Sequence, residues 1–308
     1  MTTIREQIET YYKELPEHSD VEPDHSHWYS PYLPKCMNES ALKELNDSLR
    51  PGEDADKRIY THLYGERILS LDGKEIIEYH LNTEGYRTFD FFRDPDEKIR
   101  NVLILGDSFT FGIGVNDEQT YSSYIHKFLN NFSSNVLEEN NKRAKTVVWN
   151  LGVPGISNDG ITRNLFHFMK YFKPMTVFIL WTYDHRREWI DDKNMLHKIV
   201  TNHPRTQQNN SHIYKSFMQQ GNKYWDTYSF EKNQLLAMLL CEINQIPLIN
   251  FSIKYFPKLD FTRDNEHPGP ESHKLFSAIL YRELVKINSF EEEREKQYQE
   301  YIDFLESL

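Results

Sequence analysis

Short apolar runs alternate with longer mixed segments along most of this chain. Four of the runs have the length and composition of buried strands, at residues 101–105, 145–151, 175–181 and 246–252. Helices are predicted in the segments between and after them, at residues 118–130, 160–171, 230–244 and 270–287. This alternation predicts an α/β protein whose parallel sheet is covered by helices on both faces.

An aromatic-rich segment, residues 1–95, precedes the alternating part. Disordered segments are poor in aromatic side chains, so we predict an ordered N-terminal extension that packs on the core. Its sequence predicts helices at residues 4–15 and 40–49. It also predicts a β-hairpin, because Asp72-Gly73 is a strong turn signal flanked by two apolar runs, residues 67–71 and 75–79.

The alternating part is predicted to form one domain over residues 96–288. A polar insertion at about residues 186–226 is too long for a simple connection, and it predicts either a lid at the strand ends or a decorated surface. Residues 289–308 have apolar side chains at helical spacing. They predict a C-terminal helix that docks on the body of the protein or on another subunit of a homo-oligomer.

Composition excludes several classes of protein. The 308 residues carry a net charge of −11, with 47 acidic against 36 basic side chains and no dense basic stripe, so nucleic acid is not an expected partner. The sequence has no run of eighteen apolar residues and no basic segment followed by an apolar one at its start. We therefore expect no membrane span and no signal peptide, and a cytoplasmic or virion-associated protein. Two cysteines, Cys36 and Cys241, do not suggest a disulfide scaffold.

Neither a metal nor a cofactor is expected. Asp24-His25-Ser26-His27 carries potential metal ligands, but no second pair with ligand spacing accompanies it, so we interpret it as an exposed turn. The glycines of residues 111–114 lack the lysine and the spacing of a phosphate-binding loop.

Two short motifs supply candidate chemistry. Gly106-Asp107-Ser108 directly follows the first predicted strand, and Asp264-x-x-His267 follows the last one. Open α/β sheets bind their ligands at the carboxyl ends of the strands, so both motifs are expected at the same edge. Each motif alone is also common in ordinary loops, because Gly, Asp and Ser favour turns. Their arrangement favours a serine activated by a histidine, with a carboxylate that orients the imidazole.

With these motifs, residues 78–287 resemble the SGNH hydrolase superfamily of GDSL-like esterases and lipases. The resemblance rests on three ordered blocks: Gly106-Asp107-Ser108, Asn150-Leu151-Gly152-Val153-Pro154-Gly155, and Asp264-x-x-His267 followed by Pro268-Gly269. The stretch from Leu81 to Arg87 also resembles the Asn-x-x-Gly-x-Arg lead-in of one branch of that family. The fold that this resemblance implies is a three-layer, flavodoxin-like parallel sheet, and the glycine-rich residues 111–114 become a flexible loop beside the nucleophile.

Carried over residue by residue, the resemblance implies a triad of Ser108 as nucleophile, His267 as base and Asp264 as orienting acid. It further implies that the oxyanion is met by the backbone N–H groups of Ser108 and Gly155 and by an asparagine side chain. Nearby substrate contacts are expected from the remaining polar residues of the blocks, Asp107, Asn150 and Asp184. His273, in the helix after the last block, is interpreted as a packing residue.

The sequence departs from the family pattern at that asparagine. The third block usually reads Gly-x-Asn-Asp after a strand, and this chain has Trp181-Thr182-Tyr183-Asp184 there. Three outcomes stay open. Tyr183 or Thr182 supplies the missing donor, the site works with two backbone donors at lower activity, or the chain has kept the fold and lost catalysis.

The resemblance implies a serine ester hydrolase without a cofactor. By analogy, we expect it to remove a small acyl group such as acetyl from a carbohydrate, so its partner would be a small-molecule or glycan ester. Two alternatives belong to other classes: an O-acyltransferase with the same triad, and a non-catalytic binding or structural protein, for example in a virion.

Overall fold

The computed structural model describes residues 77–91, 99–136, 145–190, 196–200, 223–262, 267–288 and 291–307, together with residues 67 and 68 and five residues near the N-terminus. Among the described residues, no helix has the length and apolar character needed to cross a bilayer.

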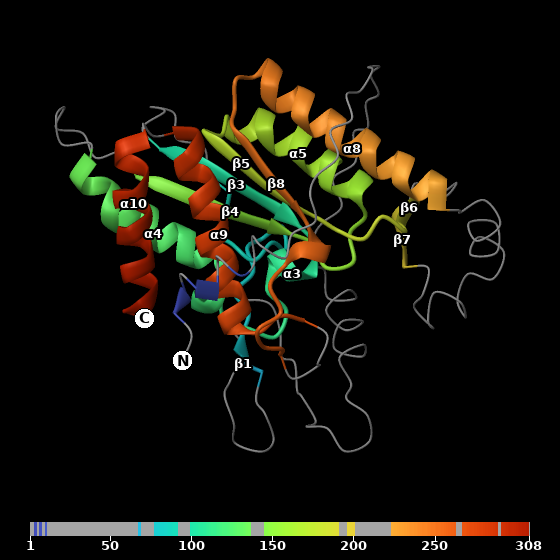
Figure 1. The fold of residues 1–308 in the computed structure, drawn as a ribbon. Helices are drawn as coiled ribbons and strands as arrows, with labels where there is room; N and C mark the ends of the chain where they lie inside the picture. Colours follow the sequence, from blue (N-terminus) through green and yellow to red (C-terminus); the bar gives the residue numbers. More distant parts are fainter. Residues whose placement is uncertain are drawn as a thin grey trace.

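A parallel sheet of four strands forms the centre of the molecule (Figure 1). Its strands are β3 (Arg100–Gly106), β4 (Thr146–Gly152), β5 (Thr176–Trp181) and β8 (Leu248–Ser252), and their order is β4-β3-β5-β8. In chain order this is 2-1-3-4, the arrangement of flavodoxin-like sheets. The α/β, flavodoxin-like prediction is therefore confirmed, and each predicted strand agrees with the structure to within two residues at either end.

Helices cover both faces of the sheet, which gives three layers (Figure 1). One face carries α5 (Asn158–Phe172) and α8 (Lys223–Ile243). The other carries α4 (Tyr121–Val136), α9 (Pro270–Asn288) and the C-terminal α10 (Glu291–Glu306). The start of α8 was predicted seven residues too late, because its first turns expose Tyr224, Trp225 and Tyr228 and so lack an apolar face.

The central strands are apolar throughout because both of their faces are buried. Alternate residues of β3 enter opposite cores: Leu103 and Leu105 pack with α5 and α8, whereas Val102 and Ile104 pack with α4 and α9. Side chains on a strand alternate between its faces, so a strand between two helical layers needs an unbroken apolar run.

Two glycines let the short helix α3 (Ser108–Phe111) lie against the ends of the central strands. Gly106 of β3 and Gly152 of β4 are neighbours in register. A Cβ atom on Gly152 would lie 2.3 Å from the backbone nitrogen of Phe111, and one on Gly106 would lie 2.0 Å from the Thr110 hydroxyl oxygen. Larger residues would push α3 away from the sheet, which explains why both family-like blocks contain a glycine here.

The described part of the N-terminal extension contains the predicted hairpin pairing. Strand β1 (Arg67–Ile68) pairs antiparallel with β2 (Ile77–Glu78), and the register is centred between positions 72 and 73, as the turn signal predicts. Residues after β2 pack into the core through buried side chains, among them Tyr79, Leu81 and Tyr86. Helical residues at 4, 6, 7 and 10 fall within the first predicted helix, whereas the predicted helix at 40–49 lies outside the described residues.

The insertion begins as a hairpin of β6 (Arg186–Ile190) and β7 (Leu196–Val200). Ion pairs join β6 to the neighbouring helices: Arg163 of α5 binds Glu188, and Arg187 binds Asp226 of α8. The larger part of the insertion lies outside the described residues, so its function as a lid stays a prediction.

The C-terminal helix docks on the body of its own chain. Tyr298, Tyr301, Ile302 and Leu305 are buried, and the ring of Tyr301 lies 4.4 Å from that of Phe128 in α4. A homo-oligomer formed through this helix stays a prediction.

Candidate active site

Ser108 is the first residue of α3, directly after the carboxyl end of β3. Asp107 caps this helix, since its Oδ1 accepts a hydrogen bond of 3.0 Å from the Phe109 N–H. The first N–H groups of a helix have no acceptor within the helix, and no described residue accepts from the Ser108 N–H. β3 and β5 are also the strands at which the chain order of the sheet reverses, which is where open α/β sheets bind ligands.

Gly155 lies beside this helix in a tight turn. The Ile156 N–H donates to the Val153 carbonyl over 3.1 Å, and Gly155 has a φ of 73°, so Val153 to Ile156 has the features of a type II turn with Pro154 and Gly155 at its centre. The Val153 N–H donates to the Gly106 carbonyl over 2.9 Å, which fixes the turn to the end of β3. The Gly155 N–H has no acceptor among the described residues. Two unpaired backbone donors thus flank the start of α3.

His267 lies near the start of α3, although 159 positions separate it from Ser108 in the sequence. The imidazole packs edge-on against the ring of Phe109, with centroids 5.6 Å apart. The Ser108 hydroxyl makes no hydrogen bond to the described residues, His267 included. Catalytic hydrogen bonds commonly tighten only when substrate is bound, so a missing bond does not argue against a Ser108–His267 pair. Asp264 lies outside the described residues, and its function as the orienting acid stays a prediction.

Asp260 holds the loop that carries His267. Its carboxylate accepts from the Ser272 N–H over 2.8 Å, from the Ser272 hydroxyl over 2.7 Å and from the Glu271 N–H over 3.0 Å, so it caps α9. The Thr262 N–H donates to the His267 carbonyl over 2.9 Å, which closes the base of the loop. The capping role of Asp260 was not predicted from the sequence. Capping residues are expected just before a helix, and Asp260 lies ten residues upstream of α9.

Asp107 is buried and binds other protein groups. Its side chain is 0% exposed, and its Oδ2 accepts from the Thr182 hydroxyl over 2.7 Å and from Nη1 of Arg186 over 2.6 Å. Asp107 was expected to contact the substrate, but in the structure its carboxylate binds Thr182 and Arg186. The carboxylate instead connects the end of β3 to the end of β5.

The segment in the position of the third block is held by Asn158. The Thr182 N–H donates to the Asn158 Oδ1 over 3.0 Å, and the Asn158 side-chain amide donates to the Thr182 carbonyl over 3.2 Å. The Thr182 hydroxyl already donates to Asp107, so it has no proton left for a substrate oxygen. The Tyr183 ring lies 5.5 Å from that of His185 and 5.4 Å from the Arg186 guanidinium carbon.

Asn150 and Asp184, the other two expected substrate contacts, are also engaged elsewhere. The Asn150 amide is buried and donates to the Thr110 carbonyl over 2.9 Å and to the Ser122 hydroxyl over 3.0 Å. Asp184 pairs with Lys254 over 3.4 Å. Lys254 follows β8, which lies on the opposite side of β5 from β3.

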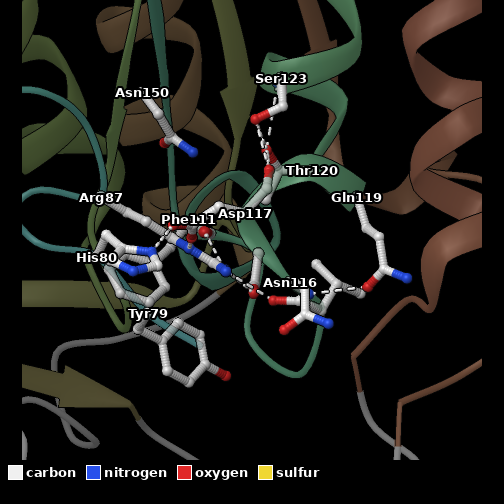
Figure 2. Close-up of polar contacts among 12 residues, drawn as sticks. Tyr79, His80, Arg87, Phe111, Asn116, Asp117, Gln119, Thr120, Ser123 and Asn150 are labelled. Carbon is white, nitrogen blue, oxygen red and sulfur yellow. Dashed lines mark hydrogen bonds and ion pairs between the residues drawn. The ribbon is translucent and has the colours of Figure 1, made fainter. Parts of the chain in front are cut away.

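The lead-in arginine anchors the loop after α3 (Figure 2). The Arg87 side chain is 2% exposed, stacks 4.4 Å over the Tyr79 ring and pairs with Asp117. Its guanidinium donates to the carbonyls of Gly112, of Phe111 over 3.2 Å and of Val115 over 2.7 Å. This loop was expected to be flexible, whereas in the structure the Arg87 side chain anchors it through these hydrogen bonds. A planar guanidinium has five N–H donors, so one side chain can hold several carbonyls at once.

His273 is a buried residue of α9, as predicted for a packing residue. Its ring is stacked on that of Tyr121 at 5.8 Å, and its Nδ1 accepts from the Tyr121 N–H over 3.4 Å. Nδ1 is then unprotonated, so Nε2 carries the hydrogen, and Nε2 has no acceptor among the described residues. Burial, with Arg87 and His267 nearby, lowers the pKa of His273 from 6.5 to about 3.

The depressed pKa of His273 predicts a loss of stability in acid. Between pH 6.5 and about 3 the unfolded chain binds a proton here that the folded chain does not, so the free energy of unfolding falls as the pH drops through this range. The slope from one such group reaches about 1.4 kcal/mol per pH unit. His273→Asn keeps an acceptor for Tyr121 and removes the titration. Urea unfolding across this range should therefore show a shallower pH slope for the variant, and equal slopes would contradict the assignment.

The described residues form an α/β protein in which Ser108 and Gly155 follow the carboxyl ends of β3 and β4. No protein-family model matches the sequence, and no curated protein matches it either. Among the described residues, no group of three or more His, Cys, Asp or Glu side chains is placed to hold a metal ion.

Solved structures similar to this chain include several esterases and acylhydrolases. An esterase, EstA from Pseudoalteromonas sp., is 18% identical with a TM-score of 0.34, over 61% of this chain and 97% of that one. A lipase/acylhydrolase from Enterococcus faecalis is 16% identical with a TM-score of 0.31, over 60% of this chain and 95% of that one. A two-domain esterase active on acetylated mannans is 15% identical with a TM-score of 0.33, over 61% of this chain and 50% of that one.

Proposed function

We propose that this chain is a serine ester hydrolase of the SGNH type, with Ser108 as nucleophile, His267 as general base and Asp264 as the acid that orients the imidazole. The observation that carries the proposal is the contact between His267 and Phe109, because it brings the imidazole beside the residue that follows Ser108. The unpaired N–H groups of Ser108 and Gly155 at the same strand ends support it further.

The reaction would proceed in two halves. In the first, the Ser108 oxygen bonds to the ester carbonyl carbon, its proton passes to an imidazole nitrogen of His267, and the carbonyl oxygen becomes an oxyanion near the backbone donors. The tetrahedral intermediate then re-forms its carbonyl and expels the alcohol oxygen, which takes the proton from His267. In the second half, water replaces the alcohol, attacks the acyl-serine and releases the acid.

For the substrate we propose a small acyl ester, such as acetyl, on a carbohydrate. Three exposed aromatic side chains support this choice: Tyr224, Trp225 and Tyr228 at the start of α8. α8 leads into the amino end of β8, so its first turns lie at the same edge of the sheet as Ser108 (Figure 1). Their rings offer broad apolar faces with a polar tip, which suit the mixed polarity of sugars.

A fluorophosphonate probe tests the proposed nucleophile directly. Such probes phosphorylate a serine only where it is activated, so incubation followed by mass spectrometry should find one probe adduct on the peptide that contains Ser108. Ser108→Ala is the matched control and should remain unlabelled. Wild-type protein without an adduct on Ser108, under conditions that label a known serine esterase, would refute the proposal.

The alternative classes predict different results in the same experiment. An O-acyltransferase forms the same acyl-serine and is labelled equally, so it is distinguished by acyl transfer to an added polysaccharide without net hydrolysis. A non-catalytic protein would leave Ser108 unlabelled. The observation in favour of this last class is Tyr183 at the position of the expected asparagine.

A further inference from the structure

We infer that Arg186 supplies the side-chain donor for the oxyanion, in place of the asparagine that this chain lacks. The inference rests on the proposed function and assigns a substrate-contacting group to it. Arg186 opens β6, five positions after the end of β5, and its guanidinium is bound to the carboxylate of the residue directly before Ser108. It therefore reaches the strand ends where an ester would meet the nucleophile.

The guanidinium is held in one orientation. Its Nη1 lies 2.6 Å from Asp107 Oδ2, the same oxygen that accepts from the Thr182 hydroxyl over 2.7 Å. The Tyr183 ring lies 5.4 Å from the guanidinium carbon, within the range of a cation–π contact. Asp107 is in turn fixed through its other oxygen, which caps α3. Because the guanidinium is planar, fixing one of its nitrogens and one of its faces also fixes the directions of its remaining N–H groups.

Some donors of this guanidinium are unused. Nε of Arg186 is buried and has no acceptor among the described residues, and Nη2 makes no hydrogen bond to them. The Arg186 side chain as a whole is 12% exposed, so part of it meets solvent. A buried donor without an acceptor is costly, so the arrangement is best explained by an acceptor that arrives with the substrate.

The other side chains of this block are less suited to the task. The Thr182 hydroxyl is committed to Asp107, and the Tyr183 ring contacts both the guanidinium and His185. An arginine also remains charged at any working pH, and hydrogen bonds from charged donors to an oxyanion are stronger than those from an amide. Because Asp107 balances the charge of Arg186, the pair adds no net charge before the oxyanion forms.

The test compares esters whose carbonyl oxygen is present or replaced by sulfur. Sulfur is a weak acceptor, so a donor that contacts this atom raises the rate for p-nitrophenyl acetate more than for p-nitrophenyl thionoacetate. We expect Arg186→Gln to lower kcat for the oxygen ester about 100-fold with little change in KM, since the contact is made in the transition state. The ratio of oxygen-ester to thiono-ester rates should fall by about tenfold or more in this variant.

Two further variants keep the result interpretable. Arg186→Lys retains a cation for Asp107 and should fold, but it lacks the fork, so its ratio should fall between those of Arg186→Gln and wild type. Arg187→Gln is the matched control, because Arg187 is the next residue, points to the other face of β6 and pairs with Asp226. It should retain the wild-type ratio.

Distinct outcomes separate this inference from the function on which it rests. Equal losses for both esters in Arg186→Gln and Arg186→Lys would show that Arg186 only positions Asp107, and an unchanged kcat would show that it does nothing; either result overturns the inference while hydrolysis stands. Wild-type protein with no turnover and no probe adduct on Ser108 would overturn both.

Discussion

Ser108→Ala is expected to lower kcat for p-nitrophenyl acetate by at least about four orders of magnitude, which is the loss typical of removing a serine nucleophile. The variant should unfold at nearly the wild-type Tm, because the hydroxyl makes no hydrogen bond to the described residues and its removal leaves no partner unsatisfied. Steady-state kinetics and a thermal melt measure the two quantities on the same preparation.

Ser122→Ala provides the matched control for this prediction. The same atom is removed from a serine that is also buried, but the Ser122 hydroxyl accepts from the Asn150 amide over 3.0 Å and lies in the first turn of α4. Its loss should therefore cost stability, about 1 kcal/mol, and leave kcat within a few-fold of wild type. Substantial turnover by Ser108→Ala would refute the assignment of the nucleophile.

His267→Gln should lower kcat/KM by about 10⁴-fold, because a serine hydroxyl without a base remains protonated and is a weak nucleophile. Glutamine retains a similar size and a polar end, so the loop base formed by the Thr262 N–H and the His267 carbonyl should persist. The rate of fluorophosphonate labelling of Ser108 should fall in parallel, and this measurement does not depend on which ester is the natural substrate.

His80→Gln serves as the control for the imidazole. His80 is largely exposed and pairs with Asp117, the carboxylate that also pairs with Arg87. We expect its replacement to change kcat/KM less than threefold, in line with surface substitutions that leave the structure intact. If His267→Gln is labelled as fast as wild type, another group must activate Ser108, and the proposed base is wrong.

Local signals in the sequence predicted the parts of the site that lie at strand ends. Ser108 directly follows a buried strand and Gly155 follows Pro154 in a turn dipeptide, so both positions are determined by their immediate neighbours. His267 required the additional step that the first and last motifs meet at one edge, which parallel strands enforce.

Side chains that act across strands left no such signal. Asn158 bonds Thr182, Asp260 bonds Ser272 and Arg186 bonds Asp107, and in each case the partners come from different elements. Asp107, Asn150 and Asp184 were expected to contact the substrate, and in the structure each binds another element of the chain. A polar residue near a motif is easily predicted to contact substrate. The sequence does not show that its hydrogen bonds are made to a neighbouring element.

The sequence by itself determined the α/β alternation, the strand positions, the glycines that admit α3 and the order of the motifs, because these depend on periodicity and on steric limits within a few residues. Only the tertiary structure decided that Arg186 meets Asp107 at the ends of β5 and β3. This contact depends on which apolar surfaces pack together over the whole chain. Packing between segments that are distant in sequence produces no local sequence pattern.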